Sequence, residues 1–160
     1  MAHQIVLDAI GTVHSAVKEP KDDFWGDVTC RIDLDPSRVD PDCLVGLAEF
    51  SHVEVLFLLH LVPEAAIVTG SRHPRNRPEW PKVGIFAQRG RNRPNRIGVT
   101  ICRLLSVVNL SLEVTGLDAI DRTPILDIKP YMREFAARGE IRQPQWASEL
   151  MEGYWKSGQL

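Results

Sequence analysis

The feature that most limits the fold is a repeated pattern in which every second residue of a short stretch is apolar. Residues 28–34 and 110–117 both show this pattern. A period of two is typical of a β-strand with one buried face. These stretches do not alternate with long helical segments, as a doubly wound parallel sheet would require. We therefore predict a mainly β fold, a single-domain antiparallel β-barrel with short peripheral helices and one C-terminal helix.

The chain has the length of one domain and can bury a core, because it contains 160 residues. We assign residues 1–160 to this domain, with its core at about 5–135 and a helical tail at about 144–157. Apolar and β-branched runs between turn residues predict the other strands. They span residues 5–13 (interrupted at Gly11), 50–62, 65–69, 83–86, 97–108 and 125–128.

Two helices are predicted from their start signals. Asp40 followed by Pro41 is typical of an N-cap and a first helical position, so a short helix is expected over residues 40–48. Pro144 precedes an apolar stripe at helical spacing, which we interpret as packing against the core or a second subunit rather than as a ligand site. The stripe consists of Trp146, Leu150, Met151, Tyr154 and Trp155.

The most apolar stretch, residues 50–62, is expected to be a central strand. His52, Glu54 and His60 would then share one face of it. A metal site is one interpretation of such a face. We favour a polar face that lines a pocket and predict no metal, because a straight strand would hold these side chains too far apart.

An arginine-rich loop lies between two apolar stretches, in the sequence GIFAQRGRNRPNRIG (residues 84–98). Four guanidiniums in eight residues repel one another unless anions, carboxylates or backbone carbonyls lie among them. The flanking glycines let the backbone approach a ligand closely, whereas Pro94 restricts it. An anion or nucleotide cradle and a solvated hairpin tip are equally compatible with this loop.

Charge is unevenly distributed along the chain. Residues 71–103 contain nine Lys or Arg and one acidic residue, a charge of +8, whereas the whole chain carries −2. Such segregation favours a polyanionic partner near the basic segment, either RNA or a phosphorylated ligand.

Cysteine use and hydropathy point to a soluble cytoplasmic protein. Cys30, Cys43 and Cys102 are far apart and form no CxxC pair, so neither a disulfide framework nor a zinc site is expected. The N-terminus lacks the basic region of a signal peptide. The longest apolar run is too short to span a membrane.

Three segments in this order resemble the TsaA/TrmO-like family. They are FSHVEVLFLLH (50–60), the arginine-rich segment (84–98) and GLDAIDRTPILDIKPY (116–131). The resemblance covers about residues 5–135. It implies a β-barrel methyltransferase that uses S-adenosylmethionine to methylate N6 of the threonylcarbamoylated adenosine-37 of tRNA. It also implies a homodimer with the cofactor near the subunit boundary. Independently of the resemblance, the sequence lacks the glycine motif of a Rossmann cofactor site.

The same resemblance implies the cofactor contacts when the motifs are matched position by position. The matched residues are His60, Leu61, Arg89, Val99, Asp127, Ile128, Lys129 and Pro130. The family also has an N-terminal Pro-Arg-Gln contact, whose nearest counterpart here is Pro20, Lys21 and Asp22. Arg122 replaces the family's usual glycine after Asp121, so the turn there is expected to differ.

Three residues are candidates for catalysis. Asp127 and Tyr131 could orient the exocyclic amine and accept positive charge as it develops, and Asn95 could pair with an adenine edge. Alternatives remain for each: an ion pair for Asp127, packing for Tyr131 and a turn position for Asn95. Phosphate contacts to tRNA are expected from the basic segment, and a merely solvated basic face is the alternative. These contacts are Arg72, Arg75, Arg77, Arg91, Arg93 and Arg96.

Two other functions remain compatible with the sequence. One is an S-adenosylmethionine-dependent methyltransferase that acts on a small molecule. The other is a non-catalytic RNA- or nucleotide-binding module on the same scaffold. Salt-dependent RNA binding would separate the first from tRNA methylation, and cofactor binding without turnover would indicate the second.

Overall fold

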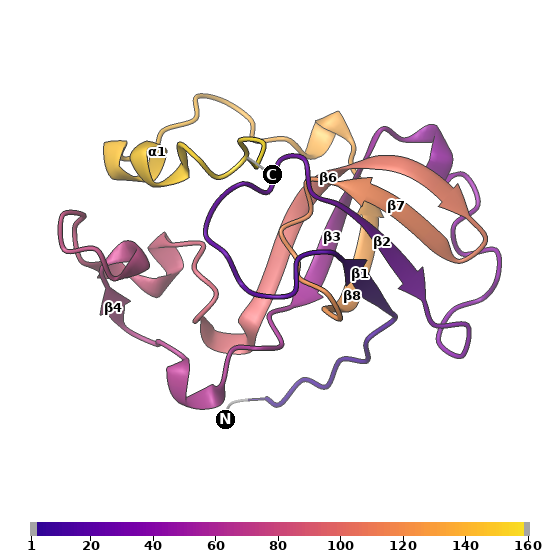
Figure 1. The fold of residues 1–160 in the computed structure, drawn as a ribbon, viewed down its shortest axis with the longest axis horizontal. Helices are drawn as coiled ribbons and strands as arrows, with labels where there is room; N and C mark the ends of the chain where they lie inside the picture. The colour runs from indigo at the N-terminus through magenta and orange to yellow at the C-terminus, as the bar shows by residue number, and fades with distance from the viewer. Residues whose placement is uncertain (1–2, 159–160) are drawn as a thin grey trace.

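A computed structural model describes residues 3–158 of the chain, and six of its strands close into an antiparallel barrel (Figure 1). The strand order around the barrel is β1-β2-β7-β6-β3-β8. Every pairing between neighbours is antiparallel. This confirms the mainly β barrel with a C-terminal helix that the alternating pattern predicts. The barrel strands are β1 (Gly11–Ser15), β2 (Thr29–Leu34), β3 (His52–Leu58), β6 (Ile97–Val108), β7 (Ser111–Thr115) and β8 (Pro124–Pro130).

The barrel interior is filled by the apolar residues of the alternating pattern. In β3, Val53, Val55 and Phe57 are buried, whereas the residues between them are partly exposed on the outside. Gly98 of β6 lies opposite Phe57, and a Cβ at this position would lie 2.4 Å from the phenylalanine ring. The core therefore requires glycine at residue 98.

A β-bulge between β3 and β8 sets which β8 residues face outward. The register shifts between Leu56 and Phe57, so that Phe57 pairs with Ile125 and Leu56 pairs with Asp127. A bulge of this kind re-aims the side chains that follow it. As a result Asp127 lies on the outer face of the barrel rather than among the core residues.

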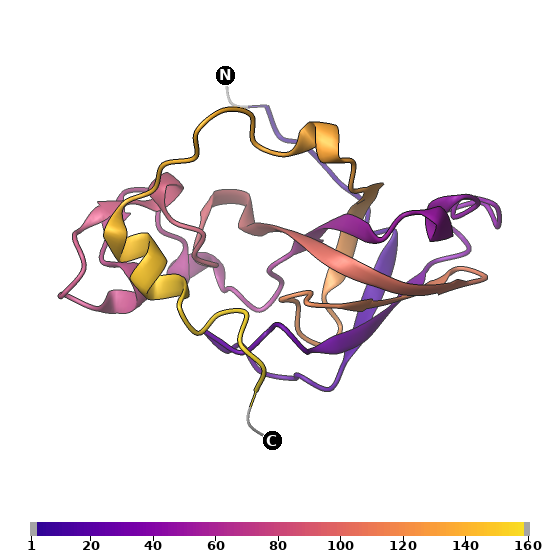
Figure 2. The same cartoon turned by 90° about the horizontal axis from the view of Figure 1, so that it is seen from above.

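A lobe formed mainly by residues 59–96 lies beside the barrel and contains a two-stranded sheet of β4 (Ser71–Arg72) and β5 (Val83–Gly84). The helix α1 (Gln145–Met151) lies against this lobe (Figures 1 and 2). Short 3₁₀ helices make up most of the other regular structure; they are Leu47–Glu49, Glu64–Ala66, Pro74–Asn76, Ile85–Ala87, Pro94–Arg96 and Arg133–Phe135.

The first strand is shorter and begins later than the sequence predicts. It starts at Gly11, and residues 5–10 form no regular structure. The reason is that this segment follows the loop after β2: Asp8 pairs with Arg38 at 3.1 Å, and the carbonyl of Ile10 accepts from the amide of Asp35.

Three other local predictions are wrong. Residues 41–46 form turns and a 3₁₀ helix spans Leu47–Glu49, in place of the continuous short helix predicted over 40–48, because Gly46 adopts a left-handed conformation with φ 83°. Residues 65–69 contain the end of a 3₁₀ helix instead of a strand. The strand predicted at 83–86 stops at Gly84, after which the chain turns into a 3₁₀ helix.

The C-terminal helix forms after Pro144, as its start signal predicts, but it ends at Met151. Tyr154 and Trp155 follow the helix instead of continuing its stripe. Tyr154 is partly buried against the barrel, whereas Trp155 is 48% exposed. No helix in residues 3–158 is both long enough and apolar enough to cross a membrane.

Candidate functional site

Three residues form a row across the outer face of the barrel. Val99 of β6 pairs with Leu56 of β3, which pairs on its other side with Asp127 of β8. Asp127 forms an ion pair with Lys129, and its Oδ1 accepts a hydrogen bond of 2.9 Å from the amide of Ile128. The hydrogen bond to Asp127 raises the pKa of Lys129. The row therefore presents one anchored carboxylate beside two apolar side chains.

Hollows lie on both sides of the end of β8. The larger, of about 540 Å³, lies between β8 and the segment 39–50, and Asp127, Ile128 and Pro130 contribute to its wall. The smaller, of about 270 Å³, is lined by Lys129, Pro130 and Tyr131, together with residues of neighbouring segments. The two catalytic candidates on this stretch therefore line different hollows, Asp127 the larger and Tyr131 the smaller.

Arg89 lies in the loop that follows the 3₁₀ helix Ile85–Ala87, and its side chain reaches Val99 near the start of β6. Its guanidinium is exposed and donates a hydrogen bond of 2.8 Å to the carbonyl of Val99, the residue in the row. Within residues 3–158 the guanidinium makes no other hydrogen bond, so its remaining N–H groups suit an anion. His60 and Leu61 follow β3 at the same end of the β3–β6 pair, since Leu58 pairs with Ile97.

The loop at residues 20–27 is held down by its own contacts. Lys21 donates a 2.6 Å hydrogen bond to the carbonyl of Phe24, and its ammonium lies 4.7 Å from the centre of the Trp25 ring. Trp25 is buried, and its Nε1 has no hydrogen-bond partner in residues 3–158. The predicted cofactor residues Pro20, Lys21 and Asp22 belong to this loop.

Arg75 clamps the same loop. It donates two hydrogen bonds, of 2.9 and 2.8 Å, to the carboxylate of Asp23 and a third to the carbonyl of Asp22. The bonds to Asp23 raise the pKa of Arg75. Because both side chains of the pair are mostly covered, with exposed fractions of 18% and 26%, the pair ties the lobe to the loop.

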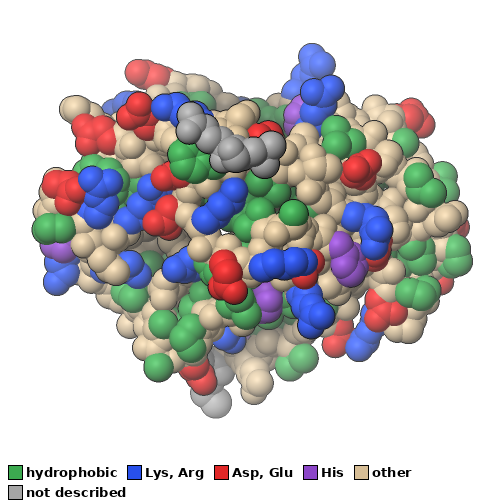
Figure 3. Space-filling model, in the orientation of Figure 1, with side chains coloured by type: hydrophobic (Ala, Val, Ile, Leu, Met, Phe, Trp, Pro, Cys, Tyr) green, Lys and Arg blue, Asp and Glu red, His purple; other side chains and the backbone are tan. Residues whose placement is uncertain are grey.

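Several arginines of the basic segment donate hydrogen bonds to backbone carbonyls or side chains of the same chain. Arg93 donates to Gln88 and Arg96 donates to Val62, so the repulsion expected among neighbouring guanidiniums is offset within the chain. Arg77 pairs with Glu79 and stacks on Trp80. Figure 3 shows Lys and Arg interspersed with Asp and Glu over one face of the molecule.

The six arginines predicted to bind RNA therefore differ in their surroundings. Arg75 makes three hydrogen bonds to Asp22 and Asp23, whereas Arg72 donates one of 2.9 Å to Asn76. Arg91 is exposed. Their contacts with RNA remain a prediction. Asn95 is also exposed and has φ 62°, a turn conformation that asparagine tolerates.

A polar cluster that the sequence interpretation missed lies near Arg89. Asp118 accepts hydrogen bonds from the hydroxyls of Thr100 and Tyr154, one on each carboxylate oxygen. Burial raises the pKa of Tyr154, and Asp118 raises it further. The available signal was an aspartate between two apolar residues, Leu117 and Ala119, inside the third motif.

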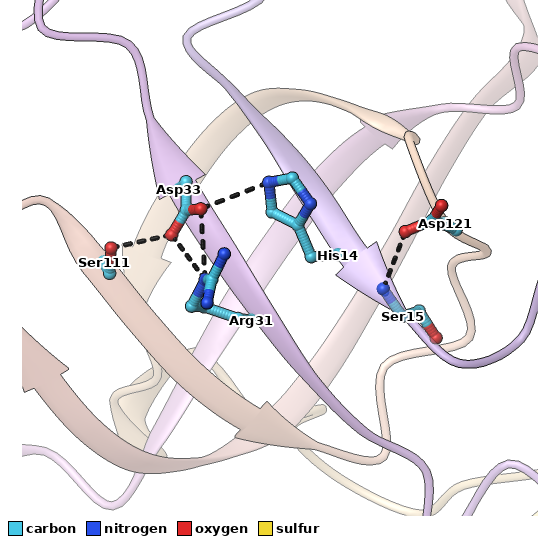
Figure 4. Close-up of polar contacts among 6 residues, drawn as sticks. All are labelled: His14, Ser15, Arg31, Asp33, Ser111 and Asp121. Carbon is cyan, nitrogen blue, oxygen red and sulfur yellow. Dashed lines mark hydrogen bonds and ion pairs between the residues drawn. The ribbon is translucent and has the colours of Figure 1, made fainter.

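A second polar network lies on another side of the barrel, over β1, β2 and β7 (Figure 4). Asp33 accepts hydrogen bonds from Ser111 and Arg31 and lies 3.1 Å from His14. Burial raises the pKa of Asp33 somewhat, but these bonds lower it by more. This network joins three strands and contains none of the residues predicted to contact the cofactor.

The sequence raised a metal site at His52, Glu54 and His60 as one interpretation of a shared strand face. His52 and Glu54 do share the outer face of β3, and His60 lies beyond its end. Among residues 3–158, no group of three or more His, Cys, Asp or Glu side chains is arranged to hold a metal ion.

Comparison with known proteins identifies the relatives of this barrel. Residues 13–137 match the model of the tRNA-methyltransferase O N-terminal domain. The chain belongs to this family. It is 32% identical to a probable S-adenosyl-L-methionine-binding protein of Methanothermobacter thermautotrophicus, and the match covers 85% of this chain and 96% of the relative.

Two further members of the tRNA-methyltransferase O family are longer. The chain is 37% identical to a human tRNA (adenine(37)-N6)-methyltransferase over 63% of its own length, which is 22% of the human protein. The crystal structure of TrmO from Pseudomonas aeruginosa superimposes with a TM-score of 0.67 and 30% identity, over 89% of this chain and 61% of that one. The chain thus corresponds to about a fifth of the human relative.

The residues of this family member fit the chemical groups of S-adenosylmethionine. Its carboxylate suits the free N–H groups of Arg89, and its ammonium and ribose hydroxyls suit a carboxylate such as Asp127. The unpartnered indole N–H of Trp25 is one further donor in the loop predicted to contact the cofactor. The apolar walls beside β8 suit an adenine ring.

Proposed function

We propose that this chain is an S-adenosylmethionine-dependent methyltransferase that acts on N6 of adenine-37 in tRNA, with the threonylcarbamoylated adenosine as the acceptor. Two of the relatives described above carry the name of the enzyme or of its cofactor. The observation that carries the proposal is the row Val99, Leu56 and Asp127, flanked by two hollows and by the guanidinium of Arg89.

When bound, S-adenosylmethionine supplies a methyl group on a positively charged sulfur and needs no further activation. The work left to the protein is alignment and exclusion of water. Arg89 would hold the carboxylate of the cofactor, and Asp127 would accept from its hydroxyls or ammonium. Residues 20–22, 60–61 and 128–130 would cover its remaining surface.

The acceptor amine of adenine is a weak nucleophile and loses a proton as it gains the methyl group. Asp127 can accept a hydrogen bond from this amine and take up the proton. Tyr131 lines the smaller hollow and can orient the base, whereas the exposed amide of Asn95 can pair with the adenine edge.

The phosphates of tRNA would contact the arginines that retain exposed guanidinium groups. Arg91 is the leading candidate because it is exposed, and Arg77 also retains an exposed side chain beside Glu79. Binding through such contacts weakens steeply as salt concentration rises. A small-molecule methyltransferase would show no such RNA binding.

The first test is calorimetric titration with S-adenosylmethionine. Wild-type protein should bind it saturably, and Arg89→Ala and Asp127→Ala should each weaken binding at least tenfold. Arg31→Ala, which removes an exposed charge paired with Asp33 in the network over β1, β2 and β7, is the matched control and should bind as the wild type does. Absence of binding to folded wild-type protein would refute the proposal.

The second test defines the acceptor. Transfer of a labelled methyl group should occur to tRNA with threonylcarbamoyladenosine at position 37 and not to tRNA with guanosine there. Equal transfer to unmodified adenosine-37 would show that the threonylcarbamoyl group is not required. Cofactor binding without transfer to any tRNA would favour a small-molecule acceptor or a binding module.

A homodimer and a cytoplasmic location belong to the same proposal. The outer face near the smaller hollow carries exposed apolar residues, including Ile101 (46%) and Phe135 (82%), which a second subunit could cover. Light scattering coupled to size-exclusion chromatography should give twice the mass of one chain. A mass of one chain at micromolar concentration would contradict the dimer.

A further inference from the structure

The C-terminal segment, residues 145–158, lies outside the part of the chain that matches the family model. It docks on the loop at 20–27 through its backbone: Phe24 donates to the carbonyl of Gly153 at 3.1 Å, and Trp25 donates to that of Tyr154 at 2.8 Å. Gly26 approaches so closely that a Cβ there would lie 2.0 Å from the carbonyl oxygen of Trp155. The segment is therefore packed against the loop by main-chain contacts.

The same segment also contacts the lobe. The indole Nε1 of Trp80 donates a 3.1 Å hydrogen bond to Glu149 in α1. Both views of the fold show the end of the chain running from the lobe across the 20–27 loop (Figures 1 and 2). The C-terminal segment thus joins two parts of the molecule that lie far apart in the sequence.

Tyr154 connects this segment to the barrel. Its hydroxyl donates to one oxygen of Asp118, and the hydroxyl of Thr100, a buried residue of β6, donates to the other. Burial, followed by the charge of Asp118, keeps the pKa of Tyr154 above that of a free phenol. The hydroxyl therefore remains a hydrogen-bond donor at physiological pH.

The Tyr154–Asp118 contact lies between two sets of residues that we expect to contact the cofactor. Thr100 directly follows Val99, whose carbonyl receives the hydrogen bond from Arg89. On the other side, the backbone of Tyr154 holds Trp25, next to the loop residues that Arg75 clamps. The charges of Arg89 and Arg75 both act on the Tyr154 phenol, which places the three groups near one another.

We propose that Tyr154 and Asp118 are positioning residues for methyl-donor binding: their hydrogen bond fixes the loop at 20–27 relative to Arg89 and Val99. This inference rests on the proposed function. It assigns a role to the C-terminal segment, which neither the motifs nor the family match includes. The pair acts through the loop and through β6, and neither residue is required to touch the donor.

The test uses variants that remove the hydrogen bond and keep the shape of the side chains. Tyr154→Phe removes the hydroxyl, and Asp118→Leu replaces both acceptor oxygens with methyl groups. Each should raise the KM for S-adenosylmethionine about tenfold and leave kcat at saturating donor within twofold of the wild type. The double variant should be no worse than the worse single variant, because both changes break the same contact. The amide protons of Phe24 and Trp25 should exchange about tenfold faster in all three.

Ser111→Ala is the matched control, because it also removes a hydroxyl-to-aspartate hydrogen bond, to Asp33 on another side of the barrel. It should change neither the KM for the donor nor exchange at Phe24 and Trp25. Hydrogen exchange needs no turnover, so it reports on the loop even in a variant with low activity. If Tyr154→Phe folds poorly, Asp118→Leu carries the same test.

The outcomes separate this inference from the proposed function. Wild-type binding of the donor together with unchanged KM and unchanged exchange in both single variants would overturn the positioning role alone. A decrease in kcat as large as the increase in KM would also overturn it, since this would place the pair in the transfer step. Failure of the wild type to bind the donor would overturn both the proposed function and the positioning role.

Discussion

Arg122, in the turn between β7 and β8, adopts φ 64°, a left-handed conformation that glycine occupies more readily. Its amide donates a 2.7 Å hydrogen bond to the carbonyl of Val13, so the turn is fixed against β1. The resemblance to the family places a glycine at this position. The chain thus holds an arginine in a conformation that glycine adopts more readily.

Replacing Arg122 with glycine should therefore stabilise the protein. We expect the free energy of unfolding to rise by on the order of 1 kcal/mol or less, because relief of the left-handed conformation is partly offset by the greater freedom of glycine in the unfolded chain. Urea denaturation measures this. Asn109→Gly, at φ 53°, should give a smaller gain because asparagine tolerates the conformation. A less stable Arg122→Gly variant would contradict the argument.

Gly98 is a second position at which a single atom matters. Gly98→Ala should lower the free energy of unfolding by about 1–3 kcal/mol, since its Cβ would meet the buried ring of Phe57. Thermal and urea denaturation measure the loss. Gly70→Ala is the control, because a Cβ at residue 70 has no neighbour within 4 Å. Equal stability of the two variants would show that the core can rearrange around the methyl group.

At the scale of elements, the lobe and the C-terminal segment hold the loop at 20–27 from two sides. Arg75 clamps Asp23 from the lobe, and the carbonyls of Gly153 and Tyr154 pair with the loop from the other side. A loop fixed in this way loses little further entropy when a ligand binds, which favours affinity. The elements around the barrel therefore matter to the site as much as the barrel strands do.

Arg75→Ala tests this arrangement. We expect the free energy of unfolding to fall by about 1–2 kcal/mol, because Asp23 would lose a bidentate partner while it remains mostly covered. The affinity for S-adenosylmethionine should fall as well. Arg91→Ala, which removes an exposed guanidinium, should leave both quantities unchanged. The structural role of Arg75 would be contradicted if Arg75→Ala is as stable as the wild type and weakens tRNA binding as much as Arg91→Ala does. Arg75 would then act as an RNA contact.

The whole molecule also responds to pH through its outer carboxylates. Hydrogen bonds from Lys18 and from the amide of Ser15 lower the pKa of Asp121, and Ser111 and Arg31 lower that of Asp33 (Figure 4). A carboxyl group with a lowered pKa in the folded state stabilises the fold above its unfolded pKa of about 3.9. That contribution is lost as the pH falls through the lower, folded value.

We therefore expect the melting temperature to decrease as the pH is lowered from about 5 to 2, near and below the aspartate pKa. The variant Asp33→Asn with Asp121→Asn should be less stable than the wild type at pH 7 and should show a shallower decrease in acid. Calorimetry across this pH range measures both effects. If the melting temperature of the double variant falls with pH as steeply as that of the wild type, other carboxyl groups control the decrease.

The sequence alone determined the barrel strands and the family. Alternation in residues 28–34 and 110–117 predicts β2 and β7 because successive side chains of a strand face opposite sides. Their polarity therefore alternates with a period of two. The motif that contains Asp127 and Tyr131 likewise pointed to the family, but Asp127 and Tyr131 line different hollows, which the motif does not indicate. Local prediction failed where a single glycine or a tertiary contact overrides propensity, as at Gly46 and at residues 5–10.

Tertiary structure decided which side chains meet across the molecule. The bulge at Leu126, between the pairs Leu56–Asp127 and Phe57–Ile125, turns Asp127 outward, and this register depends on the pairing of β8 with β3. Asp118 and Tyr154 are separated by 36 positions, and Arg75 and Asp23 by 52, so only barrel closure and docking of the lobe bring them together. Such contacts depend on the relative placement of whole elements, which periodicity and spacing do not specify.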